Sequence, residues 1–348
     1  MPWCSRPSKL APEPVAIQQC TPWTDPADPE VHFPLAAFEE LLAAFGWADP
    51  QQWLHHWQGR GGVGLAQSHW SSGTRRDWIW GLGLPLLTQI EHCLGSGQRR
   101  LIGVSGLPGS GKTSLGRWLE AAAAQLGWPV AVISLDDFYF AAAELDRAMA
   151  GNPWGVPRAL PGSHDLALME RVLSGWQRGE ALHAPRFDKA LRGGRGDRCG
   201  WHSRTAELLL IEGWFLGCSA SGFAGGFSQD SRLPFLTAKE RAYRPVVEAA
   251  LKTYEPIWQR LDFLWHLKAL EFNATATWKS EQEQTMLAHR GVSLPPTELN
   301  QFVRMILSAL PQAYLEAIHS DAQVDLTMAR QLNRITLAKS TCWLDQMN

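Results

Sequence analysis

The stretch LIGVSGLPGSGKTSLGRWLEAAAAQLG, residues 101–127, limits the possible folds more than any other part of the chain. In this stretch an apolar run passes through a glycine-rich turn directly into a segment with helical spacing. Three further apolar runs, PVAVISLDDFY, AELLLIEGW and LDFLWHLKA, are separated by helical segments. Continuous apolar runs that alternate with helices are typical of strands buried on both faces of a parallel sheet. The sequence therefore predicts an α/β fold with a mostly parallel sheet.

The glycine-rich turn fits the pattern G-x-x-x-x-G-K-[ST] through Gly106, Gly111, Lys112 and Thr113. It follows a predicted strand and opens a predicted helix, which is the context in which this pattern binds phosphate. We expect Lys112 to reach the β and γ oxygens of a nucleotide and the Thr113 hydroxyl to ligate Mg²⁺. The alternative is a purely structural turn. The predicted nucleotide-binding residues are Gly106, Gly109, Ser110, Gly111, Lys112, Thr113 and Ser114.

Carboxylates follow two of the other apolar runs. Glu212 comes directly after four apolar residues and is our candidate for the second metal ligand, although a carboxylate there can also simply cap a turn. Asp136 and Asp137 follow the second run, at the edge where parallel sheets bind ligands. A carboxylate in that position would orient an acceptor alcohol and take its proton, and capping of a helix is the alternative.

The 348 residues carry a net charge of −2, so the chain has no overall positive field to hold nucleic acid. The six cysteines show no ligand-like spacing, and we expect reduced thiols in a cytoplasmic protein. No stretch reaches the roughly 18 apolar residues of a membrane span. The 18 tryptophans are spread along the chain and indicate packing.

Two regions precede and interrupt the predicted α/β domain. Residues 1–34 contain eight prolines and should form an extended arm, and a small helical region follows it. We place the arm and small helical region at 1–75 and the main domain at 76–348. The segment 217–235 is rich in glycine and serine and predicts a long surface loop.

One run, PRFDKALRGGRGDR at 185–198, has a basic residue at every third position. Its glycines exclude a helical face. With a net charge near zero and no interleaved aromatic residues, it is a poor nucleic-acid tract. Its basic residues are Arg186, Lys189, Arg192, Arg195 and Arg198.

Several motifs together carry a family resemblance. Ser134, Asp136, Phe138 and Tyr139 fit S-x-D-x-F-[YH], the pattern of the uridine kinase, phosphoribulokinase and pantothenate kinase group. Within that group the chain resembles the plant and cyanobacterial type of D-glycerate 3-kinase, through SLDDFY, LPGSHDLAL, PRFDKALRGGRGDR, IEGWFLG, YEPIWQRLDFLWHLKA and WKSEQEQTMLAHRGVSLPPTELNQFV. The resemblance implies a P-loop NTPase three-layer fold and a helical lid at about 276–292. It also implies ATP, Mg²⁺, D-glycerate as acceptor and 3-phosphoglycerate as the photorespiratory product, formed by direct in-line transfer.

The same resemblance assigns roles to single residues. Asp136 would be the catalytic base, with Lys112 assisting transfer. Two motifs, GSHD and PRFDK, would bind the acceptor through His164, Asp165, Arg186 and Lys189, with Arg186 on the carboxylate. Arg195 and Arg198 would contact the acceptor or the transferring phosphoryl group.

Other interpretations stay open at this point. The GSHD motif can serve as a helix cap, a basic glycine-rich loop can be solvated, and Arg192 fits a surface charge. Lys279 replaces an arginine and Ala190 a serine of the family pattern. The alternative functions are a related kinase for another hydroxylated acceptor, such as pantothenate or a nucleoside, and a non-kinase P-loop ATPase or switch protein. The sequence does not determine the oligomeric state.

Overall fold

The computed structural model describes residues 23–25, 28–33, 35–70, 76–220 and 236–338. Most of the predicted proline-rich arm and residues 221–235 of the predicted surface loop lie outside these ranges.

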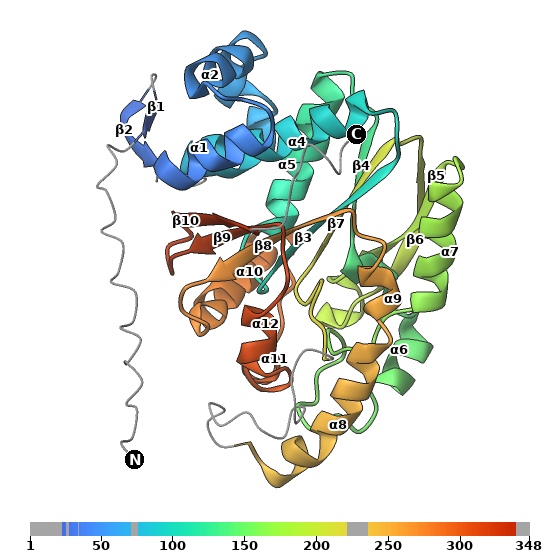
Figure 1. The fold of residues 1–348 in the computed structure, drawn as a ribbon. Coiled ribbons are helices and arrows are strands. Elements are labelled where there is room, and N and C mark those ends of the chain that lie inside the picture. The colour runs from blue at the N-terminus through green and yellow to red at the C-terminus, as the bar shows by residue number, and fades with distance from the viewer. Residues whose placement is uncertain (1–22, 26–27, 34, 71–75, 221–235, 339–348) are drawn as a thin grey trace, which may run out of the picture.

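A six-stranded sheet forms the centre of the molecule, with strand order β10-β9-β8-β3-β7-β4 (Figure 1). All neighbouring pairs are parallel except β9 and β10. This arrangement confirms the predicted α/β fold with a mostly parallel sheet. The strands are β3 (Arg100–Gly106), β4 (Val130–Ser134), β7 (Leu208–Gly213), β8 (Phe263–Ala269), β9 (Ala322–Leu326) and β10 (Leu332–Leu337).

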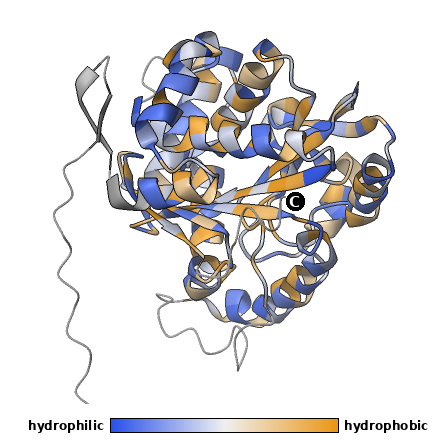
Figure 2. Ribbon diagram, turned by 45° about the horizontal axis from the view of Figure 1, so that its top comes forward, coloured by the Kyte–Doolittle hydropathy of each residue, from blue (hydrophilic) through white to orange (hydrophobic). Residues whose placement is uncertain are grey.

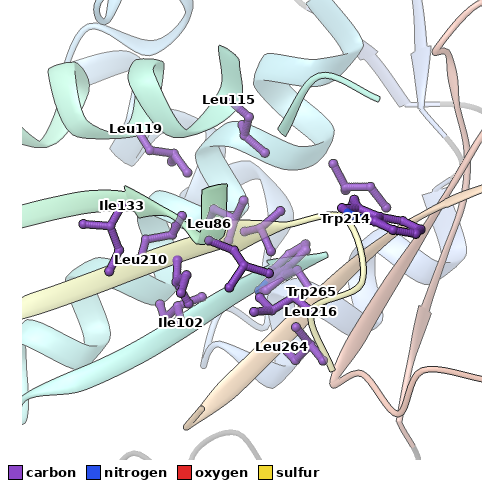
Figure 3. Close-up of a cluster of buried hydrophobic side chains, with 14 of the residues drawn as sticks. Leu86, Ile102, Leu115, Leu119, Ile133, Leu210, Trp214, Leu216, Leu264 and Trp265 are labelled. Carbon is purple, nitrogen blue, oxygen red and sulfur yellow. The ribbon is translucent and has the colours of Figure 1, made fainter. Parts of the chain in front are cut away.

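The four predicted apolar runs form four adjacent strands of the sheet, β8, β3, β7 and β4, of which β4 is at the edge. Every residue of β7 is buried, as expected for a strand covered on both faces. Figure 2 shows hydrophobic residues along the central strands and hydrophilic ones on outer surfaces. In Figure 3, side chains of Leu115 and Leu119 lie over the strand residues Ile133 and Leu210. This packing anchors the phosphate-loop helix to the sheet.

The helices lie on both sides of the sheet. The connections from β3 to β4 and from β7 to β8 cross it in opposite directions, and right-handed crossovers therefore place α5 on one face and the α8–α9 connection on the other. Around these strands run α5 (Lys112–Gln125), α6 (Ala142–Ala148), α7 (Leu166–Gln177), α8 (Ala238–Lys252) and α9 (Glu255–Trp258). The last three are α10 (Ala274–Arg290), α11 (Pro296–Ser308) and α12 (Gln312–Glu316). Helix α10 coincides with most of the predicted lid.

Two small antiparallel sheets were not predicted. One pairs β1 (Trp23–Asp25) with β2 (Asp28–Phe33), and the other pairs β5 (Leu182–Asp188) with β6 (Asp197–Arg204). The basic run, residues 185–198, forms the end of β5, the loop that follows it and the start of β6. The pairing of these two strands brings the two ends of the run together, because Phe187 pairs with Arg198 and Asp188 with Asp197.

The N-terminal helices pack directly on the α/β core. They are α1 (Leu35–Ala44), α2 (Pro50–Gly59), α3 (Arg76–Trp78) and α4 (Leu84–Gly95), with a π-helical turn at Ile79–Gly83. Side chains of α1, α2 and α4 belong to the same buried cluster as the central strands. The helical character predicted for this region is confirmed, and the boundary at residue 75 stays a prediction.

Candidate functional site

The phosphate loop lies between β3 and α5 and has a backbone that needs glycine at two positions. Gly109 and Gly111 have φ values of 80° and 103°, in the left-handed region. A Cβ on Gly109 would lie 2.5 Å from the Cβ of Trp278, and one on Gly111 would lie 2.9 Å from the ring of Trp78. The loop is therefore held closely between helix α10 and helix α3.

A third element, the β9–β10 turn, also holds the loop. Arg330 donates from Nε to the carbonyl of Gly109 at 2.8 Å and from Nη1 to Glu281 of α10 at 2.7 Å. Its guanidinium lies over the ring of Trp278. The carbonyl of Arg330 accepts from Nε1 of Trp78 at 2.6 Å. Arg330 thus links α3, the phosphate loop and α10.

Three predicted residues of the nucleotide and metal site lie together at the start of α5. The Thr113 hydroxyl donates to Oε1 of Glu212 at 2.9 Å, and Glu212 is buried at the end of β7. The Lys112 ammonium is buried and donates to the carbonyl of Leu107 at 3.1 Å. Burial lowers the pKa of Lys112, opposed by the nearby charges of Glu212 and Asp136.

These residues fit a magnesium nucleotide. Among the described residues, the buried Ser110 hydroxyl has no hydrogen-bond partner, as expected for a group that bonds to a ligand oxygen. Thr113 and Glu212 offer the hard oxygen ligands that Mg²⁺ prefers, and a few ligands suffice because Mg²⁺ keeps several waters. Accordingly, the part of the chain that the structure describes contains no cluster of three or more His, Cys, Asp or Glu side chains suited to a metal. Ser114 is exposed on the first turn of α5.

The two neighbouring aspartates after β4 have different environments. Asp137 accepts from the backbone N–H groups of Ser134 at 3.0 Å and Phe187 at 3.2 Å, and caps the turn Leu135–Phe138. Burial raises its pKa to about 6. Asp136 instead pairs with the Lys189 ammonium at 2.5 Å. Burial raises the pKa of Asp136, but Lys189 outweighs burial and holds it well below its usual range.

Two predicted acceptor residues, His164 and Asp165, lie beside the segment that follows Asp136. His164 pairs with Tyr139 in a β-bridge, and the Asp165 N–H donates to the carbonyl of Phe138 at 2.8 Å. His164 is buried, stacks on Tyr139 at 4.4 Å, and shares a hydrogen bond of 2.7 Å with the Tyr254 hydroxyl. Burial lowers its pKa to about 4, so its ring is neutral at pH 7. Asp165 caps α7 through the N–H of Leu168 and also pairs with Arg198 at 3.2 Å. Asp165 therefore has the capping role left open above, and acceptor binding by either residue stays a prediction.

The remaining predicted basic residues lie apart from one another and have different partners. Arg195 is half-exposed and pairs with Asp146 at 3.4 Å, beside Arg192, which pairs with the same carboxylate at 2.5 Å. Arg198 donates from Nε to the carbonyl of Tyr139 at 2.8 Å. Arg186 is exposed on β5. These arginines do not line the pocket beside Lys112, so their direct roles stay predictions.

The pocket beside the phosphate loop has a volume of about 520 Å³, which includes its opening to solvent. It brings together Lys112, Thr113, Asp136, Lys189 and Glu212, all of which the sequence singled out. Its other lining residues include Arg158, Trp214, Phe302 and two side chains of α10, Lys279 and Gln282. Arg158 was missed although it stands just before the LPGSHDLAL motif, a position that could have drawn attention to it.

Helix α10 contributes a buried ammonium to this pocket. Lys279 forms an ion pair with Glu283, and its nitrogen lies 5.0 Å from the centre of the Phe302 ring. Burial lowers the pKa of Lys279 to about 8, with Glu283 opposing the shift. The lysine at this departure from the family pattern therefore faces the pocket.

Comparison with known proteins identifies the group to which the chain belongs. No family model matches. The chain is 31% identical over 216 residues to the "Uncharacterized kinase mug58" of Schizosaccharomyces pombe, covering 57% of this chain and 75% of that protein. The chain is a P-loop kinase. This kinase is also 29% identical over 237 residues to "D-glycerate 3-kinase, chloroplastic" of Arabidopsis thaliana, covering 64% of this chain and about half, 49%, of the plant protein.

Solved structures support the fold of the kinase. The structure described as D-glycerate 3-kinase from Cryptococcus neoformans aligns with a TM-score of 0.59 at 20% identity, covering 83% of this chain and 98% of that one. The structure of the YGR205w protein aligns with a TM-score of 0.57 at 22% identity, covering 72% and 94%. Both confirm the predicted P-loop fold. Among the described residues, no helix is long and apolar enough to cross a bilayer.

Proposed function

We propose that this kinase transfers the γ-phosphoryl group of ATP to the 3-hydroxyl of D-glycerate, with Mg²⁺ as cofactor. The observation that carries the proposal is the position of Asp136, which lines the same pocket as Lys112 of the phosphate loop and as three further cations. A carboxylate there can orient an alcohol, and an excess of positive charge suits an anionic acceptor beside the nucleotide phosphates. The relatives described as D-glycerate 3-kinases support this choice of acceptor.

In this mechanism Lys112 and the N–H groups at the start of α5 bind the β and γ oxygens. Thr113 and Glu212 would hold Mg²⁺. When bound there, the metal ion neutralises phosphate charge. Asp136 accepts a hydrogen bond from the acceptor hydroxyl and takes its proton as the new P–O bond forms and the bond to ADP breaks.

The low pKa of Asp136 means that this carboxylate acts by position and not by basicity in the ground state. Its partner Lys189 keeps it ionised, so it is always available to accept the hydroxyl proton. Proton transfer therefore occurs late, when the oxygen has begun to bond to phosphorus.

The acceptor is tested by supplying ATP and Mg²⁺ with D-glycerate, pantothenate or a nucleoside. We expect D-glycerate alone to give a new phosphomonoester in ³¹P NMR, with coupling that places it on the 3-position. Turnover of pantothenate or a nucleoside, with D-glycerate inert, would show that the proposed acceptor is wrong. Phosphate release without any phosphorylated acceptor would favour an ATPase.

A further inference from the structure

Arg158 is a fully buried cation in the wall of the pocket, with an exposed fraction of 1%. Its Nη1 donates to the carbonyls of Gly194 and Arg195, each at 2.7 Å. Its guanidinium carbon lies 5.8 Å from the centre of the Phe302 ring. The guanidinium is therefore fixed in place from one side, by a single nitrogen.

Two of the other three cations of the pocket form ion pairs with carboxylates of the protein, and the third, Lys112 of the phosphate loop, donates to the carbonyl of Leu107. Lys189 pairs with Asp136, and Lys279 pairs with Glu283. Within the described ranges, Arg158 donates to these two neutral carbonyls and has no carboxylate at ion-pair distance, although the charges of Asp136 and Glu283 are near enough to favour its charged form. Burying a guanidinium without a counter-ion is costly, and the cost is recovered when an anion binds.

The backbone next to Arg158 is also held rigidly. Ala159 has a φ of 79°, a left-handed value that is strained for a residue with a side chain. The carbonyl of Ala159 accepts from Nε1 of Trp214 at 3.0 Å. Trp214 itself lines the pocket. A strained residue that is fixed by its surroundings is typical of a position where geometry matters for ligand binding.

We propose that Arg158 binds the carboxylate of the acceptor and so selects acidic acceptors over neutral ones. The inference rests on the proposed function and names the residue that recognises its substrate class. The planar guanidinium has further N–H donors beyond Nη1, and a carboxylate accepts such donors in pairs. Phe302 and Trp214 would enclose this end of the pocket.

The nucleotide phosphates are the competing ligand for Arg158. Helix α10 lies against the phosphate loop at Gly109, which puts Lys279 of that helix near the phosphates. Arg158 is instead anchored to the segment 194–195, which connects the two strands of the β5–β6 sheet. Strand β5 of that sheet carries most of the predicted acceptor motif PRFDK. This arrangement favours the acceptor over the phosphates.

The test compares D-glycerate with glycerol, which keeps the terminal and the central hydroxyl of glycerate but has a CH2OH group in place of the carboxylate. In Arg158→Gln we expect the ratio of kcat/KM for D-glycerate to that for glycerol to fall by roughly 10- to 100-fold, because hydrogen bonds to a charged group are lost. The KM for ATP should stay near the wild-type value. Arg158→Lys keeps the charge without the fork, and should raise KM for D-glycerate more than for glycerol. Arg192→Gln, which removes a surface arginine, is the matched control.

An unchanged acceptor ratio would overturn the inference. If both acceptors lose activity equally, Arg158 only supports the segment 194–195, and if the KM for ATP rises instead, it binds phosphates. Loss of discrimination in Arg186→Gln, with Arg158→Gln unaffected, would assign the carboxylate to Arg186. Circular dichroism shows whether each variant folds. If Arg158→Gln does not fold, the comparison of the KM values for D-glycerate and glycerol in Arg158→Lys tests the inference instead.

The proposed function can fail separately. If the wild type acts on another hydroxy acid and not on D-glycerate, the proposed function is wrong, and the ratio is measured with that acid and its corresponding alcohol. A fall in that ratio upholds the role of Arg158. If the wild type accepts only neutral alcohols, both proposals are wrong.

Discussion

At the scale of single residues, Asp136 and Asp137 show how partners decide what a carboxylate can do. Asp137 has both oxygens occupied by backbone N–H groups, and it stabilises a turn. Asp136, one residue earlier, faces an ammonium in the pocket and stays ionised. The turn that Asp137 stabilises therefore places the Asp136 carboxylate in the wall of the pocket.

Asp136→Asn tests this division. An amide cannot take a proton from the acceptor, so we expect kcat to fall by about 10²- to 10⁴-fold. ADP binding, measured by isothermal titration calorimetry, should stay near normal because Lys112, Thr113 and Glu212 are unchanged. Asp146→Asn, on an exposed carboxylate that pairs with Arg192, serves as the control. If Asp136→Asn keeps its activity, Asp136 has no part in proton transfer.

At the scale of elements, helix α10 packs closely against the phosphate loop. The backbone of Trp278 occupies the space that a side chain at position 109 would need, and Trp278 donates from Nε1 to the carbonyl of Met328 at 2.7 Å. Lys279, the next residue, is brought into the pocket by the same contact. The position of the Lys279 ammonium therefore depends on the lack of a side chain at Gly109 of the phosphate loop.

Gly109→Ala should disrupt the packing of helix α10 on the phosphate loop. The new methyl group would clash with Trp278, so we expect a raised KM for ATP together with a lower melting temperature. Gly127→Ala is a matched control, because Gly127 has a similar φ of 74° but open space around its Cβ position. It should lower stability by only about 1–2 kcal/mol, the cost of left-handed backbone, and leave the KM for ATP unchanged. Equal effects of the two substitutions would contradict the close packing.

The elements also show what local sequence patterns can predict. The four apolar runs became β3, β4, β7 and β8 because buried strands have a strong hydrophobic signal. The β5–β6 and β9–β10 pairs have exposed and alternating residues and depend on partners elsewhere in the chain. Among pocket residues, Lys112, Asp136 and Glu212 follow directly from strand ends. Arg158 and Phe302 are 144 residues apart in sequence numbering, and only tertiary folding brings them together.

At the scale of the whole molecule, the N-terminal helices and the α/β core share one hydrophobic interior. The Thr88 hydroxyl of α4 accepts from Nε1 of Trp53 at 2.8 Å and of Trp57 at 2.9 Å. All three side chains are buried. Farther along, Nε1 of Trp118 in α5 donates to the carbonyl of Leu65 at 2.8 Å. The sequence indicated helices in this region, but nothing in it indicated these contacts.

Thr88→Val tests whether the N-terminal helices, which the Thr88 hydroxyl joins to one another, unfold together with the α/β core. The substitution keeps the shape of the side chain and leaves two buried indole N–H groups unpaired, so we expect a loss of about 2–4 kcal/mol in the free energy of unfolding. Thr88→Ser keeps the hydroxyl and should cost within about 1 kcal/mol. Urea denaturation followed by tryptophan fluorescence measures both. A single transition that shifts as a whole would show that the parts unfold together, and an unshifted one would exclude the coupling.

The contacts of Arg330 with the phosphate loop join parts of the chain that are synthesised far apart in time. Arg330 and Gly109 are separated by 221 positions, yet one hydrogen bond joins them. Arg330 also bonds to Trp78 and to Glu281 of helix α10. Since the ribosome makes the chain from its N-terminus, a growing polypeptide carries its phosphate loop long before the turn that secures it. The phosphate loop of a nascent chain therefore lacks these contacts until the β9–β10 hairpin has emerged.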